Sequence, residues 1–195
     1  GVIFLSSHVG DWELMAARGA LSGIPLMIVT KKLKPEWLHR AIESARARCG
    51  VRCTYEPRTL RDVMGWLKAG NTVGFVLDQY AGPPIGVRVP FFGVPVGTAT
   101  TVATFARRTG APVVPVLNYR LPGGKAVVEI CPALTWDECE GEVQRALAVN
   151  TARYVSVLES HVRAHPEQWL WIHRRFKGDL SPLRPGEWQE GRARG

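Results

Sequence analysis

The stretch SSHVGDWELM, residues 6–15, places two carboxylates within five residues of a histidine. In a regular helix, residues three or four apart share a face, which would pair His8 with Asp11. Gly10 argues against a regular helix; a turn ending at Asp11 as N-cap would leave Glu13 free to fold back toward the imidazole. Either carboxylate would fix the tautomer of His8 and raise its basicity, so that the ring could deprotonate a hydroxyl. A structural alternative, in which His8 only closes a turn and Asp11 only caps a helix, stays open.

Other polar residues occupy positions where a site could form. Asp78 and Gln79 follow the apolar run Thr72–Leu77, and functional groups in α/β proteins gather at the carboxyl ends of such strands. Arg88 lies among small loop residues before PFFG and is a candidate contact for an anionic headgroup or a phosphopantetheine.

Further arginines are candidate substrate contacts. Arg58 and Arg61 are three apart in a predicted helix and could hold a phosphate together, although a solvated helix face explains them equally well. Arg174 and Arg175 belong to WLWIHRRFKG, where aromatic and basic residues interleave. That pattern suits a membrane interface or stacking on single-stranded nucleic acid. His173, beside these arginines, is expected to be structural.

These residues are positioned by alternating elements. Apolar runs and helical periodicity, with Gly and Pro at the breaks, predict the order of elements along the chain. Strands are expected at 2–5, 26–29, 51–55, 72–77, 113–119 and 126–130, helices from about 11 to 21 and at 35–48, 60–69, 100–108 and 141–164, and a long loop from Ala81. The turn LPGGK suits a hairpin at an antiparallel edge. The alternation predicts an α/β fold with a mixed, mostly parallel sheet flanked by helices on both faces.

Composition narrows the class of protein. A chain of 195 residues is long enough for one core, so we expect one domain over 1–180 and a poorly ordered tail over 181–195. The net charge of +8 favours an anionic partner. The four cysteines form no CxxC pair and are expected to be reduced thiols, and no metal site is expected. The motifs of serine esterases, P-loop proteins, Rossmann enzymes and zincins are missing.

Three ordered motifs resemble those of one family. His8 to Glu13 matches an H-x4-D/E motif, residues 76–116 match a central block with Asp-Gln and Pro-Phe-Phe-Gly, and PEQWLWIHRRFKG, residues 166–178, matches a C-terminal motif. Together they resemble the bacterial lipid A biosynthesis (late) acyltransferases of the H-x4-D/E lysophospholipid acyltransferase superfamily. The resemblance runs from His8 to Lys177 and implies a glycerolipid acyltransferase-like fold.

The resemblance implies that His8 is a general base assisted by Glu13. It also favours Arg61 over Arg58 as the contact for a substrate phosphate. It implies transfer of a fatty acyl chain from acyl carrier protein, or from acyl-CoA, to a hydroxyl of a lipid A precursor or related glycolipid, without other cofactors. It also implies a membrane surface at the cytoplasmic face of the bacterial inner membrane, reached through an N-terminal anchor that this chain lacks. No nucleic acid is then expected as a partner. The alternative function is a nonenzymatic basic module that binds nucleic acid or anionic lipid.

Overall fold

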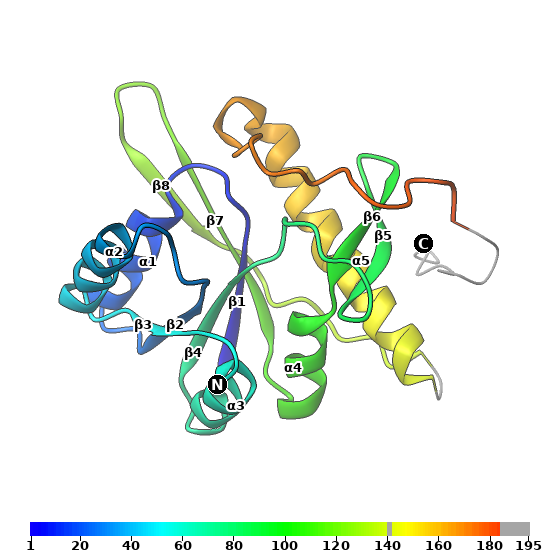
Figure 1. Ribbon diagram of the computed structural model, residues 1–195, viewed down its shortest axis with the longest axis horizontal. Helices are drawn as coiled ribbons and strands as arrows, with labels where there is room; N and C mark the ends of the chain where they lie inside the picture. The colour runs from blue at the N-terminus through cyan, green and yellow to red at the C-terminus, as the bar shows by residue number, and fades with distance from the viewer. Residues whose placement is uncertain (140–141, 184–195) are drawn as a thin grey trace.

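The computed structural model describes residues 1–139 and 142–183 and shows an α/β fold built on a six-stranded sheet (Figure 1). The strand order is β3-β2-β4-β1-β7-β8, with every pair parallel except β7 and β8. The elements are β1 (Val2–Ser6), α1 (Trp12–Leu21), β2 (Leu26–Val29), α2 (Glu36–Arg48), β3 (Arg52–Thr54), α3 (Thr59–Lys68), β4 (Thr72–Val76), β5 (Gly86–Phe91), β6 (Val94–Ala99), α4 (Thr101–Thr109), β7 (Val113–Arg120), β8 (Ala126–Ile130) and α5 (Val143–Ala164). The predicted mixed, mostly parallel sheet is confirmed.

Helices cover both faces of the sheet. Figure 1 shows α1 and α2 on one side of the strands and α4 and α5 on the other, and α3 packs against α4. In right-handed crossovers, the direction in which the chain moves across the sheet decides which face the connecting helix covers. The chain moves outward from β1 through β2 to β3 and then reverses direction to reach β4, so the later helices cover the opposite face. The central strands β1 and β4 are therefore enclosed on both faces, which explains their continuous apolar sequences VIFL and TVGFV.

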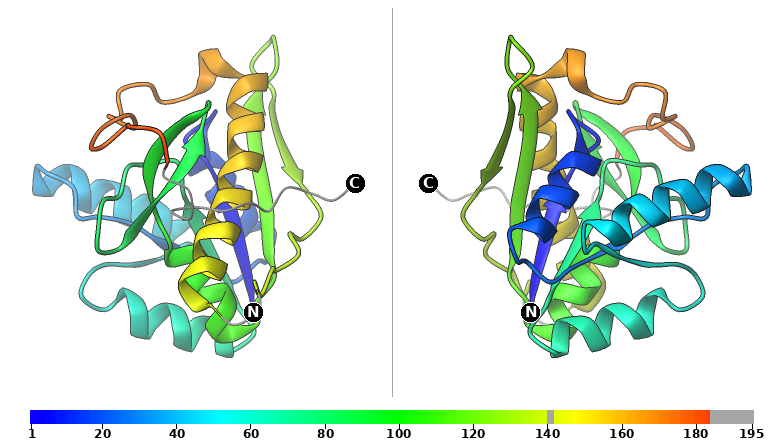
Figure 2. Two further views of the ribbon diagram at one scale, coloured as in Figure 1. Left: turned by 90° about the vertical axis from the view of Figure 1, so that its right-hand side faces the viewer. Right: turned by 90° about the vertical axis from the view of Figure 1, so that its left-hand side faces the viewer.

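The segment after Ala81, predicted as a loop up to α4, instead contains the antiparallel hairpin β5–β6. Its turn residues Phe92 and Gly93 both have positive φ, at 52° and 75°, as a tight primed turn requires. The prediction was wrong because the prolines and glycines were taken as strand breakers. A two-stranded sheet has only edge strands, where proline is tolerated, and here Pro90 faces Pro95. The hairpin packs against α5, seen in two further views in Figure 2.

Two expectations concern residues outside the described ranges. One is Gly141, which was expected to begin α5, and the other is most of the expected tail, residues 184–195. Within the described parts of the chain, no helix combines the length and apolar character needed to span a membrane.

The inner face of α5 carries His161, which is buried beside β7 and is hydrogen bonded through Nδ1 to Ser7 Oγ at 3.1 Å. Burial lowers the pKa of His161 to about 4, and the charge of His165 adds to this shift. Below its ordinary pKa of about 6.5 the unfolded chain binds a proton that the folded chain does not take up until about pH 4.

We therefore expect the free energy of unfolding to fall by about 3 kcal/mol between pH 6.5 and pH 4 because of His161. Urea unfolding at intervals across this range measures the effect. His161→Gln should flatten the pH dependence, whereas His39→Gln, at a half-buried histidine on α2, should not. Equal pH dependence in wild type and His161→Gln would contradict the assignment.

Candidate active site

The pairing of β1 with β4 brings His8 and Asp78 together. Ser6 lies opposite Val76 in this parallel pair, and the backbone N–H of Leu77 donates to the carbonyl of Ser6. His8 and Asp78 each follow two residues later, so both leave the sheet at the same carboxyl edge. This is the edge where α/β sheets place their functional groups.

The Asp78 carboxylate, 2% exposed, accepts three hydrogen bonds. Oδ1 lies 2.7 Å from His8 Nδ1, while Oδ2 accepts from the backbone N–H of His8 at 2.7 Å and from the indole N–H of Trp169 at 2.8 Å. Burial alone would raise the pKa of Asp78, but the hydrogen bonds and charge of His8 outweigh it and hold the pKa below its usual value. Asp78 is therefore a carboxylate that keeps the His8 proton on Nδ1.

The second ring nitrogen of His8 faces polar side chains. Nε2 lies 3.3 Å from the side-chain nitrogen of Gln79, which is also 3.0 Å from Nε2 of His173. The residue His8 is 8% exposed, and its ring packs edge-on against Trp12, with ring centroids 4.8 Å apart. With Nδ1 protonated toward Asp78, Nε2 carries the lone pair that a general base needs.

A turn at Gly10 separates His8 from α1. Gly10 has φ of 62°, and a Cβ atom there would lie 2.6 Å from Oδ1 of Asn118, so only glycine fits. Asp11 is the N-cap of α1: its Oδ1 accepts from the N–H of Leu14 at 3.0 Å. Its Oδ2 pairs with Arg120 at 2.7 Å. Asp11 thus caps the helix, one of the alternatives that the sequence left open.

Glu13 lies in the first turn of α1 and forms a two-point ion pair with Arg46 of α2. The guanidinium nitrogen Nε donates to Oε2 at 2.9 Å, and a second nitrogen donates to Oε1. The bond to Glu13 raises the pKa of Arg46 above its ordinary value. No hydrogen bond among the described residues joins Glu13 to His8, because both carboxylate oxygens of Glu13 accept from Arg46. The catalytic role predicted for Glu13 stays a prediction, and the carboxylate on Nδ1 is Asp78.

The C-terminal motif crosses the edge of the sheet after α5 and the 3₁₀ turn Pro166–Gln168 (Figure 1). Trp169 bridges to Val9, and the N–H of Leu170 donates to the carbonyl of His8 at 3.0 Å. The segment is thereby fixed beside the His8 turn, and it delivers Trp169 to Asp78.

Arg175, 1% exposed, is the largest fully buried side chain of the described core. Its guanidinium donates to the carbonyls of Gln79 and Gly97 at 2.7 and 2.9 Å and to the hydroxyl of Thr98 at 2.6 Å. Burial lowers its pKa to about 10, opposed by the charge of Asp78. We predicted a substrate contact here. The structure instead places Arg175 against the backbone that follows Asp78, where it fixes the position of Gln79.

The other predicted arginines lie in different places. Arg61 is on α3, 76% exposed in its side chain and 3.7 Å from Asp62, and Arg174 is exposed. The hydrogen bonds and ion pairs of the described residues connect neither of them to His8, Asp78 or Gln79. Their predicted roles as substrate contacts stay predictions.

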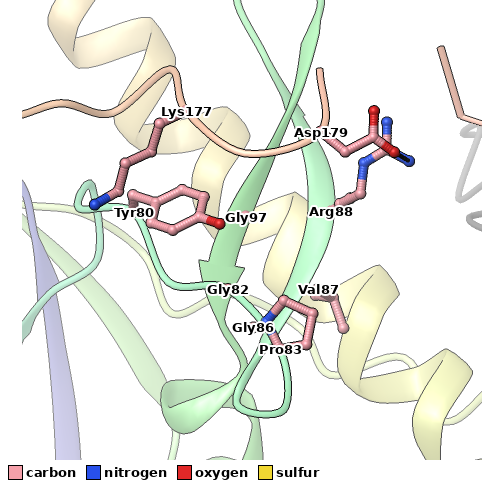
Figure 3. A pocket seen from close by; sticks show the side chains of 9 residues that line it. All are labelled: Tyr80, Gly82, Pro83, Gly86, Val87, Arg88, Gly97, Lys177 and Asp179. Atoms are coloured by element: carbon pink, nitrogen blue, oxygen red, sulfur yellow. Dashed lines mark ion pairs between the residues drawn. The ribbon is translucent and has the colours of Figure 1, made fainter. Parts of the chain in front are cut away.

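Arg88 lines a cavity of about 430 Å³, and so does Tyr80, the residue that follows Gln79 in the sequence. Figure 3 shows Tyr80 and Lys177 next to each other on one side and Arg88 paired with Asp179 on the other. Lys177 Nζ lies 4.6 Å from the centre of the Tyr80 ring, and glycines at 82, 86 and 97 also line the cavity. The cavity joins cationic and apolar surface, as a site for an amphipathic anion would.

No group of three His, Cys, Asp or Glu side chains within the described ranges is arranged to hold a metal ion. The four cysteines are free thiols.

Two residues of the site escaped the sequence reasoning. Trp169 was seen only as part of an aromatic motif, and His173 was expected to be structural, yet its ring centroid lies 4.9 Å from that of His8. Trp169 and His173 both lie in the C-terminal motif, and this was the sequence feature that could have identified them as site residues. The contacts of Trp169 with Asp78 and of His173 with His8 depend on the path of the chain after α5, which the local sequence does not encode.

Comparisons with known proteins show which family the chain resembles. A family model described as bacterial lipid A biosynthesis acyltransferase matches residues 1–178. A lipid A biosynthesis lauroyltransferase of Escherichia coli (strain K12) is 36% identical over 123 residues, covering 62% of this chain and 38% of that protein. A palmitoleoyltransferase of the same strain is 36% identical over 124 residues, covering 60% and 37%. The matched region thus spans less than two fifths of these relatives. Because the family model covers nearly the whole chain, the protein belongs to the bacterial lipid A biosynthesis acyltransferase family.

Proposed function

We propose that the protein transfers a fatty acyl chain from a thioester donor to a hydroxyl of a lipid A precursor or related glycolipid. The observation that carries the proposal is the buried His8–Asp78 pair, in which Asp78 holds Nδ1 of the ring and Nε2 faces the side-chain amide of Gln79. Family membership supports the same chemistry, since the relatives are named as lauroyl, palmitoleoyl and acyl transferases of lipid A biosynthesis.

In the proposed mechanism, His8 Nε2 removes the proton of the acceptor hydroxyl while Asp78 stabilises the imidazolium that forms. The resemblance assigned the supporting carboxylate to Glu13. We propose instead that Asp78 orients the base, because it is the carboxylate on Nδ1, and that Glu13 acts through Arg46 to hold α1 against α2. For Glu13 to assist His8 directly, its carboxylate would have to leave Arg46 and form a hydrogen bond with the His8 ring.

We propose acyl carrier protein as the donor, with acyl-CoA as the alternative, and an anionic glycolipid as the acceptor. The net charge of +8 favours both an acidic carrier protein and a phosphorylated lipid. Lys177 and Arg88, which line the cavity, are the proposed contacts for the acceptor's anionic group. Arg61 and Arg174, which do not line the cavity, would then contact negatively charged groups of the substrates elsewhere on the protein surface.

The proposed site of action is a membrane surface, on the cytoplasmic face of the inner membrane. Support comes from Trp171 and Ile172, 59% and 82% exposed, which directly precede the site residue His173. Trp37 on α2 is also exposed. Exposed aromatic and aliphatic side chains among cations are typical of proteins that rest at the headgroup level.

The test is transfer of radiolabelled acyl chains in detergent, with acyl carrier protein and CoA thioesters as alternative donors and a panel of bacterial glycolipids as acceptors. We expect label in a phosphorylated glycolipid, faster from the carrier protein. Label in no acceptor, from folded protein, would contradict the proposal. A basic binding module would instead hold nucleic acid or anionic vesicles with an affinity that drops steeply with salt.

A further inference from the structure

The side-chain amide of Gln79 lies between two imidazole rings, within hydrogen-bonding distance of Nε2 of His8 and Nε2 of His173. Because His8 Nδ1 donates to Asp78, the neutral His8 ring can only accept at Nε2. One N–H of Gln79 therefore points at the lone pair of the base. Its second N–H donates to His173 Nε2, which requires the proton of His173 to be on Nδ1.

Both ends of Gln79 are fixed. Its backbone carbonyl accepts from the buried guanidinium of Arg175 at 2.7 Å, and its amide is held by His173 at 3.0 Å. A donor held in this way loses little further freedom when charge develops in front of it, which is the property of an effective electrostatic catalyst.

The contact between Gln79 and His8 blocks the lone pair that the reaction needs. An acceptor hydroxyl that hydrogen bonds to Nε2 must displace the Gln79 N–H, which remains anchored through its other hydrogen to His173. The two nitrogens are 3.3 Å apart. A hydroxyl on one and a carbonyl oxygen on the other would therefore lie side by side, each at about 3 Å from its partner, as nucleophile and electrophile must before they react.

We propose that Gln79 is the oxyanion donor of the acyl transfer and that His173 is a positioning residue that keeps its amide aimed. This inference rests on the proposed function. It assigns the donor, which the sequence left unnamed, to a side chain next to the residue that orients the base.

The bonds and the proton of the acyl transfer are all accounted for without a covalent enzyme intermediate. As the hydroxyl oxygen bonds to the thioester carbon, its proton passes to His8 Nε2 and the carbonyl electron pair moves to oxygen, where the Gln79 N–H stabilises it. Return of that pair re-forms the C=O bond and breaks the C–S bond. The departing thiolate takes the proton from His8, which leaves an ester, a free thiol and neutral His8.

His173 can serve only while it is neutral, because a protonated ring carries hydrogen on Nε2 and cannot accept from Gln79. Burial lowers the pKa of His173, and the cationic side chains of His8 and Lys31 add to this shift, while the Asp78 carboxylate opposes it. The neutral form is therefore favoured at neutral pH.

Steady-state kinetics of the protein with acyl carrier thioester and glycolipid test the role of Gln79. Gln79→Ala should lower kcat about 100- to 1000-fold at nearly unchanged KM, because the hydrogen bond strengthens as negative charge develops on the carbonyl oxygen in the transition state. Gln79→Glu, which presents oxygens of the same reach, should be as inactive. Gln144→Ala, an exposed glutamine on α5, is the matched control and should keep wild-type kcat. Unchanged kcat in Gln79→Ala would overturn the inference.

His173→Ala should lower kcat about 10-fold, again at unchanged KM. His173→Gln, whose side-chain oxygen can accept from the Gln79 amide, should recover part of the loss. His173→Ala with unchanged kcat, or a loss that His173→Gln does not recover, would overturn the positioning role. If wild type turns over no acyl thioester, with lipid or with water as acceptor, the proposed function fails as well. Active wild type with active Gln79→Ala overturns this inference alone.

Discussion

Replacement of His8 by alanine is expected to lower kcat for acyl transfer by about 1000-fold or more, since positioned general bases contribute about 100- to 10,000-fold. The loss should appear in kcat, because the ring takes its proton only as the reaction proceeds. Wild-type and variant rates measured with the same thioester and glycolipid give the ratio, and the melting temperature of each shows whether the fold is retained.

The ring of His8 contributes packing as well as chemistry, through its contact with Trp12. His39→Ala, which removes a half-buried imidazole from α2, is the matched control and should leave kcat unchanged. A His8→Ala protein that stays folded and keeps a large fraction of the wild-type rate would show that another group deprotonates the acceptor.

Asp78→Asn is expected to cost about as much as loss of the base, for a reason visible in the hydrogen bonds. The Asp78 Oδ2 atom accepts from the His8 backbone and from Trp169, and an asparagine carbonyl oxygen can take over both bonds. Its NH₂ group then faces His8 Nδ1 and donates to it. The imidazole proton moves to Nε2, so the ring keeps its position but loses its lone pair on the substrate side. We expect kcat to fall about 1000-fold with a near-native melting temperature.

Nitrogen-15 NMR of the imidazole reports this change directly, since it distinguishes a ring protonated on Nδ1 from one protonated on Nε2. Asp11→Asn keeps the helix cap and should behave as wild type in both measurements. Glu13→Gln separates the two candidate carboxylates: we expect a modest loss, because its direct partner is Arg46. A Glu13→Gln defect as large as that of Asp78→Asn would restore Glu13 as the partner of the base.

Much of the fold was predictable because buried parallel strands have a simple sequence pattern. The strands β1, β2 and β4 are largely apolar runs, and each of the six sheet strands was placed within about two residues of its position. The β5–β6 hairpin was missed because its residues depart from that pattern. Pro90, Pro95 and Gly97 are tolerated there since each strand has a free edge, a property that depends on topology rather than on local sequence.

The site was predictable in its parts but not in its pairing. His8, Asp78 and Gln79 were each identified as candidates, yet the sequence spacing drew attention to Glu13, five residues from His8, rather than to Asp78, seventy residues away. The decisive fact is the register of β1 on β4, in which Ser6 lies opposite Val76. Strand order follows from the packing of the whole domain, so local periodicity carries no information about it.

The strap formed by residues 168–175 also has a consequence for biosynthesis. Trp169 supplies one of the three hydrogen bonds to Asp78, and Arg175 fixes Gln79, yet both are translated after every strand of the sheet. A nascent chain can therefore form its sheet while the base still lacks its oriented carboxylate and the donor still lacks its support. The site is complete only when the strap closes, so the proposed transfer could begin only after synthesis has passed Arg175.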